Sequence, residues 1–421
     1  MRAAFPLDTR DEFRILRKAK QGAQDQPQHR IHASAQLAQS ALWHRQPALP
    51  VFTKGDIDHR RAKQVVPGSR LVPTSMDDII PVVIIATRST SQASKECLSG
   101  FTLLVPRRWG NAFWLSLVHP GTRVAGQAQI RQQGIEGGKL AFPFDFVGTA
   151  MFDAYWKQEG QVQKRIWEKR PRGKRVEYEK LEIRFPYGGK AMWTQCIRNG
   201  WLHAGETMHP LIKSVLLNQK TQPWLLHIRK DTARLHTIAR ILLQQPEAPL
   251  EEISRALTEL LPLPGSAWTA NDISRLASAL VSVKLVACSR GNFTNLSPIY
   301  LDGLERDAQW RDTLHAAASE GQLDHADSIR ELESGSIAAG RQIGATTSGG
   351  YSLSKGKGYA VGSVSFLAYL ATLLRNEDES HREALAQRKR KGRNPVDTSS
   401  LLIIRDLGGP TLRAASASLA R

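Results

Sequence analysis

The hydrophobic positions in the first half of the chain predict two strands and a helix. Residues 79–87 form a β-branched run that predicts a buried strand, and residues 101–105 predict a second one. In residues 109–117 the apolar side chains, Trp114 among them, fit a buried helix. Residues 1–55 show weak periodicity and predict a partly disordered leader.

The spacing of hydrophobic residues changes twice in the second half of the chain, first to that of helices and then to that of strands. Leu235, Ile238 and Leu242 follow the i, i+3, i+7 spacing of a helix, and similar spacings predict a helical subdomain over residues 206–280. Strand patterns then return, with one helix near 304–318, at residues 281–287, 298–301, 342–347, 359–366 and 401–405. The chain is therefore predicted to be α+β, with a β-rich region over 281–421.

Composition narrows the class of protein. The 421 residues include 58 Lys and Arg against 39 Asp and Glu, a formal net charge of +19, with 41% hydrophobic residues. The hydrophobic content excludes a wholly disordered basic protein, and the longest apolar run is far shorter than the roughly 20 residues of a membrane helix. Three widely spaced cysteines indicate a reducing compartment and no disulfide framework.

The basic residues gather in three segments, which we interpret as candidate RNA contacts. A lead-in segment over 60–75 includes Arg60, Arg61 and Lys63, and a run within the loop 376–400 includes Arg388, Lys389, Arg390 and Lys391. That run has two other readings, a nuclear import signal or a solvated loop. The third segment, an insertion over 157–180, carries Lys164, Arg165, Lys169, Arg170, Arg172, Lys174 and Arg175.

A glycine-rich segment over 346–362 surrounds Tyr351, Lys355 and Lys357. Its spacing matches neither GxxxxGK[ST] nor GxGxxG, which argues against nucleotide binding. It predicts a hairpin whose lysines hold phosphates while Tyr351 stacks on a base. The alternative is a tight turn that needs glycine for positive φ.

Arg107 and Arg108 precede the predicted helix at 109–117, where unpaired N–H groups and the helix dipole favour phosphate. The alternative is that these arginines pair with nearby acids, while Trp109 and Trp114 belong to the core. No histidine motif predicts a metal site, and no cofactor is expected. Asp145, between two phenylalanines, is either a tuned acid or, more commonly, a turn cap or a partner of a buried arginine.

Several sequence segments, in the same order along the chain, resemble one protein family. Residues 100–126 and 139–149 closely resemble the POPLD domain of the largest protein subunit of eukaryotic ribonuclease P and ribonuclease MRP. Residues 60–68 are similar to the basic lead-in of that family, and 289–301, 346–362 and 401–407 to its C-terminal region. That family carries a large basic N-terminal region, whereas only residues 1–55 precede the matched part here. We therefore expect a truncated or short form that lacks part of the RNA-binding surface.

The resemblance implies an RNA-binding scaffold that is not itself catalytic. In the family, the RNA subunit cleaves precursor tRNA and precursor rRNA, so the expected partners are ribonuclease P RNA, MRP RNA and other protein subunits, with precursor tRNA bound indirectly, in the nucleus and nucleolus. A distant similarity of the family to the folate-binding T-protein implies a barrel-like C-terminal part. It leaves a folate-binding or one-carbon transfer enzyme as one alternative; a general basic RNA chaperone is another. The expected domains are a POPLD domain over 56–205, the helical subdomain and the β-rich domain.

Overall fold

The computed structural model of the chain describes residues 42, 53–66, 71–75, 77, 79–87, 100–107, 109–137, 139–205, 207–217, 222–228, 232–261, 268–320, 326–353, 356–375 and 400–420. The chain divides into two compact units, Met1–Gly126 and Gln127–Arg421, which are described separately below. None of the helices in the described ranges is long and apolar enough to cross a bilayer.

Within its described residues, the first unit contains two helices and a two-stranded antiparallel sheet. Helix α2 begins after Thr53, whose hydroxyl accepts a hydrogen bond from the Asp56 amide, while the Asp56 carboxylate accepts one from the Thr53 amide. The remaining elements are β1 (Val83–Thr87), β2 (Gly100–Leu104) and α3 (Gly110–Val118), and α2 spans Lys54–Ala62.

The two strands and the helix predicted here exist, but the predicted burial of the first strand and of the helix is wrong. Ile84 and Ile85 of β1 are 55% and 48% exposed, and Trp114 of α3 is 50% exposed. A two-stranded sheet has few neighbouring elements, so its apolar side chains lack a second layer to pack against. Trp109, just before α3, is buried as expected.

The second unit is built around a closed barrel. Its strands follow the order β4-β7-β6-β5-β8-β9, and pairing of β9 with β4 closes the ring. The short strand β3 (Trp224–Leu226) adds to β4 in parallel, beyond the part of β4 that pairs with β9. The barrel strands are β4 (Ala279–Ala287), β5 (Pro298–Tyr300), β6 (Gln342–Ser352), β7 (Lys357–Ser365), β8 (Leu401–Arg405) and β9 (Leu412–Leu419). The prediction of an α+β chain with a barrel-like C-terminal part is confirmed.

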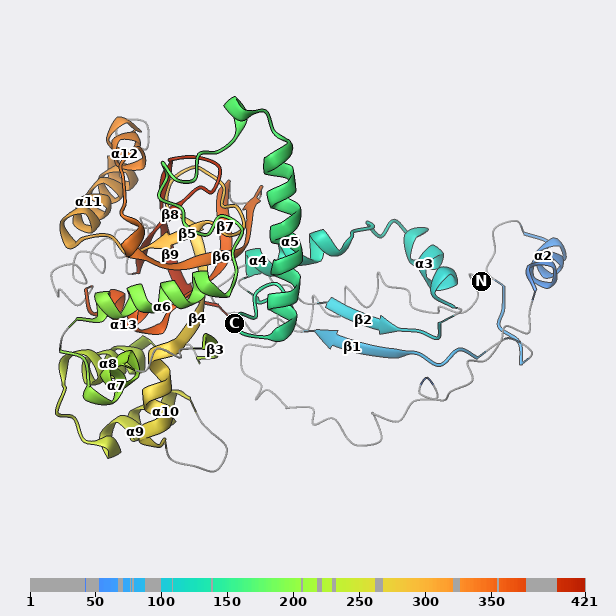
Figure 1. The fold of residues 1–421 in the computed structure, drawn as a ribbon. Coiled ribbons are helices and arrows are strands. Elements are labelled where there is room, and N and C mark those ends of the chain that lie inside the picture. Colours follow the sequence, from blue (N-terminus) through green and yellow to red (C-terminus); the bar gives the residue numbers. More distant parts are fainter. Residues whose placement is uncertain are drawn as a thin grey trace. The chain divides into compact units, whose positions relative to one another are not determined.

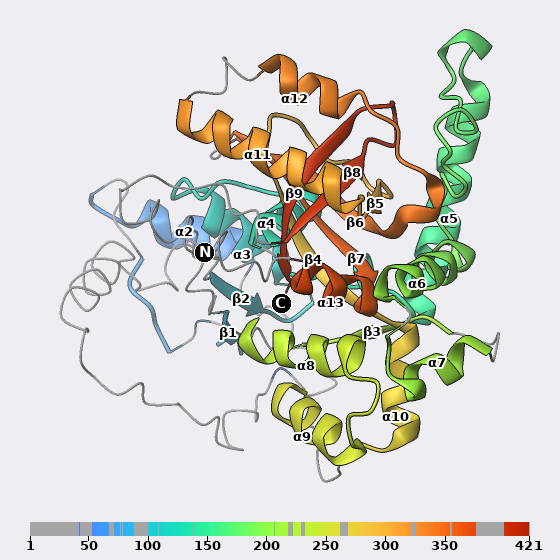
Figure 2. The same ribbon diagram turned by 90° about the vertical axis from the view of Figure 1, so that its left-hand side faces the viewer.

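Helices cover the barrel on several sides (Figure 1, Figure 2). In both views α11 and α12 lie on one side and α7 to α10 on the other, with α6 and α13 between α7 to α10 and the barrel. The helices are α4 (Gln127–Gly137), α5 (Ala150–Lys169), α6 (Lys190–Ala204), α7 (Pro210–Leu217), α8 (Thr232–Gln244), α9 (Leu250–Leu260), α10 (Ala270–Arg275), α11 (Leu304–Glu320), α12 (Ala326–Glu333) and α13 (Phe366–Leu374). Short 3₁₀ turns are η3 (Arg172–Lys174), η4 (Leu276–Ser278) and η5 (Ala339–Arg341).

The main core lies between the barrel and the helices α6, α8, α9 and α13. Helix α13 is buried on all sides, because each residue from Phe366 to Leu373 is buried. Fully buried residues from β4, β7 and α8, including Val283, Val364 and Leu242, belong to the same apolar cluster. Cys196 and Cys288 are buried free thiols, and Cys97 lies outside the described residues.

Candidate nucleic-acid interface

A basic arm, residues 161–180, projects from the second unit. Helix α5 begins after Thr149, whose hydroxyl accepts a hydrogen bond from the Phe152 amide at 3.2 Å. Phe152, Trp156 and Gly160 are the buried residues of α5. Beyond Gly160 the helix has no buried side, and Figure 1 and Figure 2 show this half extending away from the barrel.

The chain returns along α5 and stabilises the basic arm by local contacts. The Trp167 indole N–H donates to the carbonyl oxygen of Val176 at 3.0 Å, and the Tyr178 ring lies 6.2 Å from the Trp167 ring. The Arg175 guanidinium lies 5.1 Å from the centre of the Trp167 ring and donates to the carbonyl oxygen of Arg170 at 2.8 Å. Arg175 therefore has a structural role within the arm.

The other basic residues of the arm face solvent. Within residues 164–175 the only acidic residue is Glu168, and its contact with Lys164 is long, at 4.0 Å, and exposed. Exposed pairs of this kind add little stability and leave the positive charge accessible. The exposed predicted RNA contacts on the arm are Lys164, Arg165, Lys169, Arg170, Arg172 and Lys174.

The glycine-rich segment forms the predicted hairpin, made of β6 and β7. Gly356 has a φ of +61°, which favours glycine in the turn. A Cβ on Gly349 or Gly358 would lie 2.3 or 2.6 Å from a main-chain oxygen, so close backbone packing explains these two glycines. Tyr351 is 40% exposed and Lys357 is half-buried, while Lys355 lies outside the described residues.

The remaining predicted contacts belong to the first unit or to undescribed segments. Arg60 pairs with Asp77 and donates to the Val72 carbonyl, and Arg61 pairs with Asp58. Lys63 and Arg107 are exposed, and the predicted helix after Arg107 is present. Arg108 and the run Arg388, Lys389, Arg390 and Lys391 lie outside the described residues.

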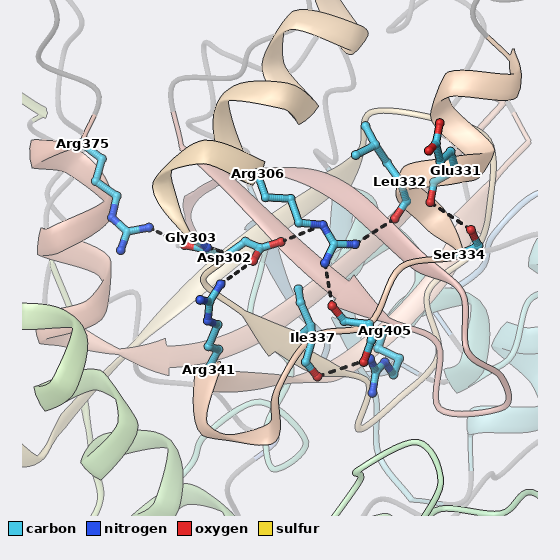
Figure 3. Close-up of polar contacts among 11 residues, drawn as sticks. Asp302, Gly303, Arg306, Glu331, Leu332, Ser334, Ile337, Arg341, Arg375 and Arg405 are labelled. Carbon is cyan, nitrogen blue, oxygen red and sulfur yellow. Dashed lines mark hydrogen bonds and ion pairs between the residues drawn. The ribbon is translucent and has the colours of Figure 1, made fainter.

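A network in which arginines surround the buried Asp302 and Asp307 was not predicted from the sequence (Figure 3). The Asp302 carboxylate accepts from Arg341 at 2.7 Å and lies 3.4 Å from Arg306, while Arg375 donates to the Asp302 carbonyl oxygen at 2.7 Å. Asp307 pairs with Arg311 at 2.7 Å. These contacts connect α11 and the end of α13 to the barrel, so part of the basic content stabilises the fold. Arg341 and Arg375 lie 39 and 73 residues from Asp302, so these two contacts give no local signal in the sequence.

Asp145 holds the segment before α5 against β6. Its carboxylate is fully buried and accepts three hydrogen bonds, from the Ala141 amide at 2.8 Å and the Thr347 and Ser348 hydroxyls at 2.6 and 2.7 Å. Arg131 in turn donates to the Ser348 hydroxyl at 2.7 Å. The prediction of a turn cap is confirmed. A carboxylate so engaged is a poor ligand for a pterin ring.

His203 lies next to the arginine network and is half-buried. Burial, together with the nearby charges of Arg375 and Arg341, lowers the pKa of His203 from 6.5 to about 4.

Within the described residues, no three His, Cys, Asp or Glu side chains come together as metal ligands do.

Comparison with known proteins finds similarity in two segments of the chain. Residues 100–193 match the model of the POPLD (NUC188) domain, and residues 320–405 match that of the POP1 C-terminal domain. The chain is also 27% identical over 136 residues to the human "Ribonucleases P/MRP protein subunit POP1", a match that covers 31% of this chain and 13% of the human protein. The POPLD match includes all of α5, and the C-terminal match includes β6, β7, α13 and β8. The chain therefore contains two segments that match domain models, one for POPLD and one for the POP1 C-terminal domain.

Proposed function

We propose that this protein is a non-catalytic, RNA-binding scaffold subunit of ribonuclease P and ribonuclease MRP. The observation that carries the proposal is the basic arm, because its exposed cations lie on a self-supporting projection rather than in ion pairs of the core. Support for the particular complexes comes from the family and from the name of the human relative.

The chemistry of the basic arm favours RNA backbone over bases. Trp167 is in contact with Arg175 and Tyr178, so its ring already has packing partners. The exposed groups are lysines and arginines, which bind phosphates without reading sequence. An arm of this kind suits a large folded RNA, whose closely spaced phosphates present a defined shape.

A subunit of this kind acts together with RNA and other proteins at a defined place in the cell. Its direct partners would be ribonuclease P RNA, MRP RNA and the other protein subunits, and its place of action the nucleus and nucleolus. Cleavage of precursor tRNA and precursor rRNA would be performed by the RNA, with this chain stabilising the RNA fold.

The salt dependence of RNA binding tests the role of the basic arm. We expect a triple substitution, Arg165→Gln, Lys169→Gln and Arg172→Gln, to weaken binding to ribonuclease P RNA. It should also reduce the log–log salt slope by about 2 to 3, since each phosphate contact contributes roughly 0.7–0.9. Filter binding or fluorescence anisotropy at several salt concentrations measures both quantities.

A control with the same loss of charge separates the arm from general electrostatics. Arg198, Arg255 and Arg290 are exposed and lie outside the basic arm. Their triple Gln variant should change the slope by much less than the arm variant. Equal slopes for the two variants would refute a localised interface. Equal affinity for unrelated structured RNA at matched salt would favour the general RNA chaperone instead.

A further inference from the structure

A cavity outside the basic arm lies beside β3, the short strand that pairs with β4. This cavity of about 660 Å³ opens between α7, β3 and α10, within the size range of small-molecule sites. It is lined by Gly148, Ser214, Val215, Gln222, Pro223, Trp224, Asn271, Ser274, Arg275 and Ser278. The proposed function gives this cavity no role.

One wall of the cavity is a polar helical face. Asn271, Ser274, Arg275 and Ser278 are spaced i, i+3, i+4 and i+7, which places them on one side of α10 and η4. The Ser274 hydroxyl donates to the Asn271 carbonyl at 2.7 Å, and the Ser278 hydroxyl donates to the Arg275 carbonyl at 3.0 Å. With their protons used in this way, both hydroxyl oxygens are left as acceptors.

Beside this helical face, the cavity is lined by an aromatic ring whose position is held by a hydrogen bond. Trp224 begins β3, opposite Ala279 of β4, and its indole N–H donates to the Arg275 carbonyl oxygen at 3.1 Å. The side chain is half-buried and lines the cavity. A fixed indole at a cavity wall is a platform on which any base can stack.

The charge in the cavity comes from Arg275. Its side chain is exposed, and in the described part of the chain no carboxylate lies within ion-pair distance of it. The amides of Asn271 and Gln222 add donors and acceptors of the kind that bind base edges. A purely apolar ligand would leave these groups unpaired, and a phosphate ion alone would leave most of the volume unused.

We propose that this cavity binds one unpaired nucleotide of an RNA strand. The base stacks on Trp224, its edge bonds to the amides of Asn271 and Gln222, and its phosphate pairs with Arg275. This inference rests on the proposed function, since it takes the partner to be RNA. It adds a contact that requires an unstacked base, whereas the basic arm contacts only the backbone.

Titration of the full chain with UMP, AMP and inorganic phosphate tests the site. We expect both nucleotides to bind more tightly than phosphate and Arg275→Gln and Asn271→Ala each to weaken nucleotide binding about tenfold or more. Both substitutions keep the backbone carbonyls that Trp224 and Ser274 bond to, so the wall stays intact. Arg255→Gln, which changes an exposed arginine on α9, is the matched control and should bind nucleotides like the wild type.

Three results would overturn the proposal: no nucleotide binding at millimolar concentration, equal binding of phosphate and nucleotide, or nucleotide binding that both variants leave unchanged. The outcome is separable from that of the proposed function. The Gln variant at Arg275 should keep its affinity for fully duplex RNA, and the triple variant of the basic arm should keep its affinity for UMP. If only the arm variant loses RNA binding, the result for the cavity is unaffected. If only the Arg275 variant loses nucleotide binding, the role of the basic arm is unaffected.

Discussion

At the scale of single residues, three buried charged side chains hold parts of the fold together. Asp145, Asp302 and Arg405 are almost inaccessible and hold segments that are distant in sequence. Arg405, for example, donates to the Ile337 carbonyl at 3.5 Å and lies 5.5 Å from the centre of the Tyr300 ring. Charge counts taken from the sequence therefore overstate what is available to bind RNA.

Replacing Asp145 by Ala should lower the free energy of unfolding by about 3 kcal/mol, because a buried amide and two hydroxyls lose their acceptor. Chemical denaturation measures the change. Asp312→Ala, at an exposed position of α11, should cost less than about 0.5 kcal/mol. A similar small cost at both positions would contradict the role given to Asp145.

His203 makes stability depend on pH in a defined direction. Its pKa of about 4 in the folded chain lies below the value of 6.5 expected when unfolded, so only the unfolded chain gains a proton as the pH falls between them. The contribution of neutral His203 to the free energy of unfolding is fully present above pH 6.5. It is lost as the pH falls towards 4, by at most roughly 3 kcal/mol.

The variant His203→Gln, which cannot titrate, should therefore lose less stability than the wild type between pH 6.5 and pH 4. Urea denaturation at several pH values in this window gives the difference. If the two proteins lose stability in parallel, the histidine is not the titrating group.

At the scale of elements, the sequence predicts periodic segments well and non-periodic ones poorly. The predicted helix near 304–318 and the barrel strands before residue 410 are present. Helix α13 was missed because it is apolar on every side and so shows no amphipathic period. Strand β9 was missed because its small residues have weak strand propensity, and pairing with β8 and β4 determines its conformation.

The hairpin of β6 and β7 carries an element-scale prediction. Lys355→Ala with Lys357→Ala should weaken RNA binding and leave the melting temperature almost unchanged, because lysine side chains are rarely part of a protein core. Binding and thermal melts test the two halves. The exposed pair Lys190 and Arg198 on α6, changed to Ala, is the control. If the hairpin variant binds RNA as tightly as the wild type, the hairpin does not contact RNA and has a structural role only.

At the scale of the whole molecule, the sequence identified the α+β class and the family strings, since both depend on local patterns. It could not predict which of the described cations are accessible. Arg60 and Arg175, both predicted RNA contacts, are engaged within the protein, whereas Arg165 and Arg172 face solvent. The cavity beside Trp224 was also out of reach, because its walls come from segments some 50 residues or more apart in the chain.

The central claim is that this protein holds the RNA of ribonuclease P and ribonuclease MRP. Purification of the full chain from its own cells under native conditions, followed by sequencing of the bound RNA, tests this most directly. We predict strong enrichment of ribonuclease P or MRP RNA over background, reduced by the triple variant of the basic arm. Recovery of neither RNA above background would contradict the account.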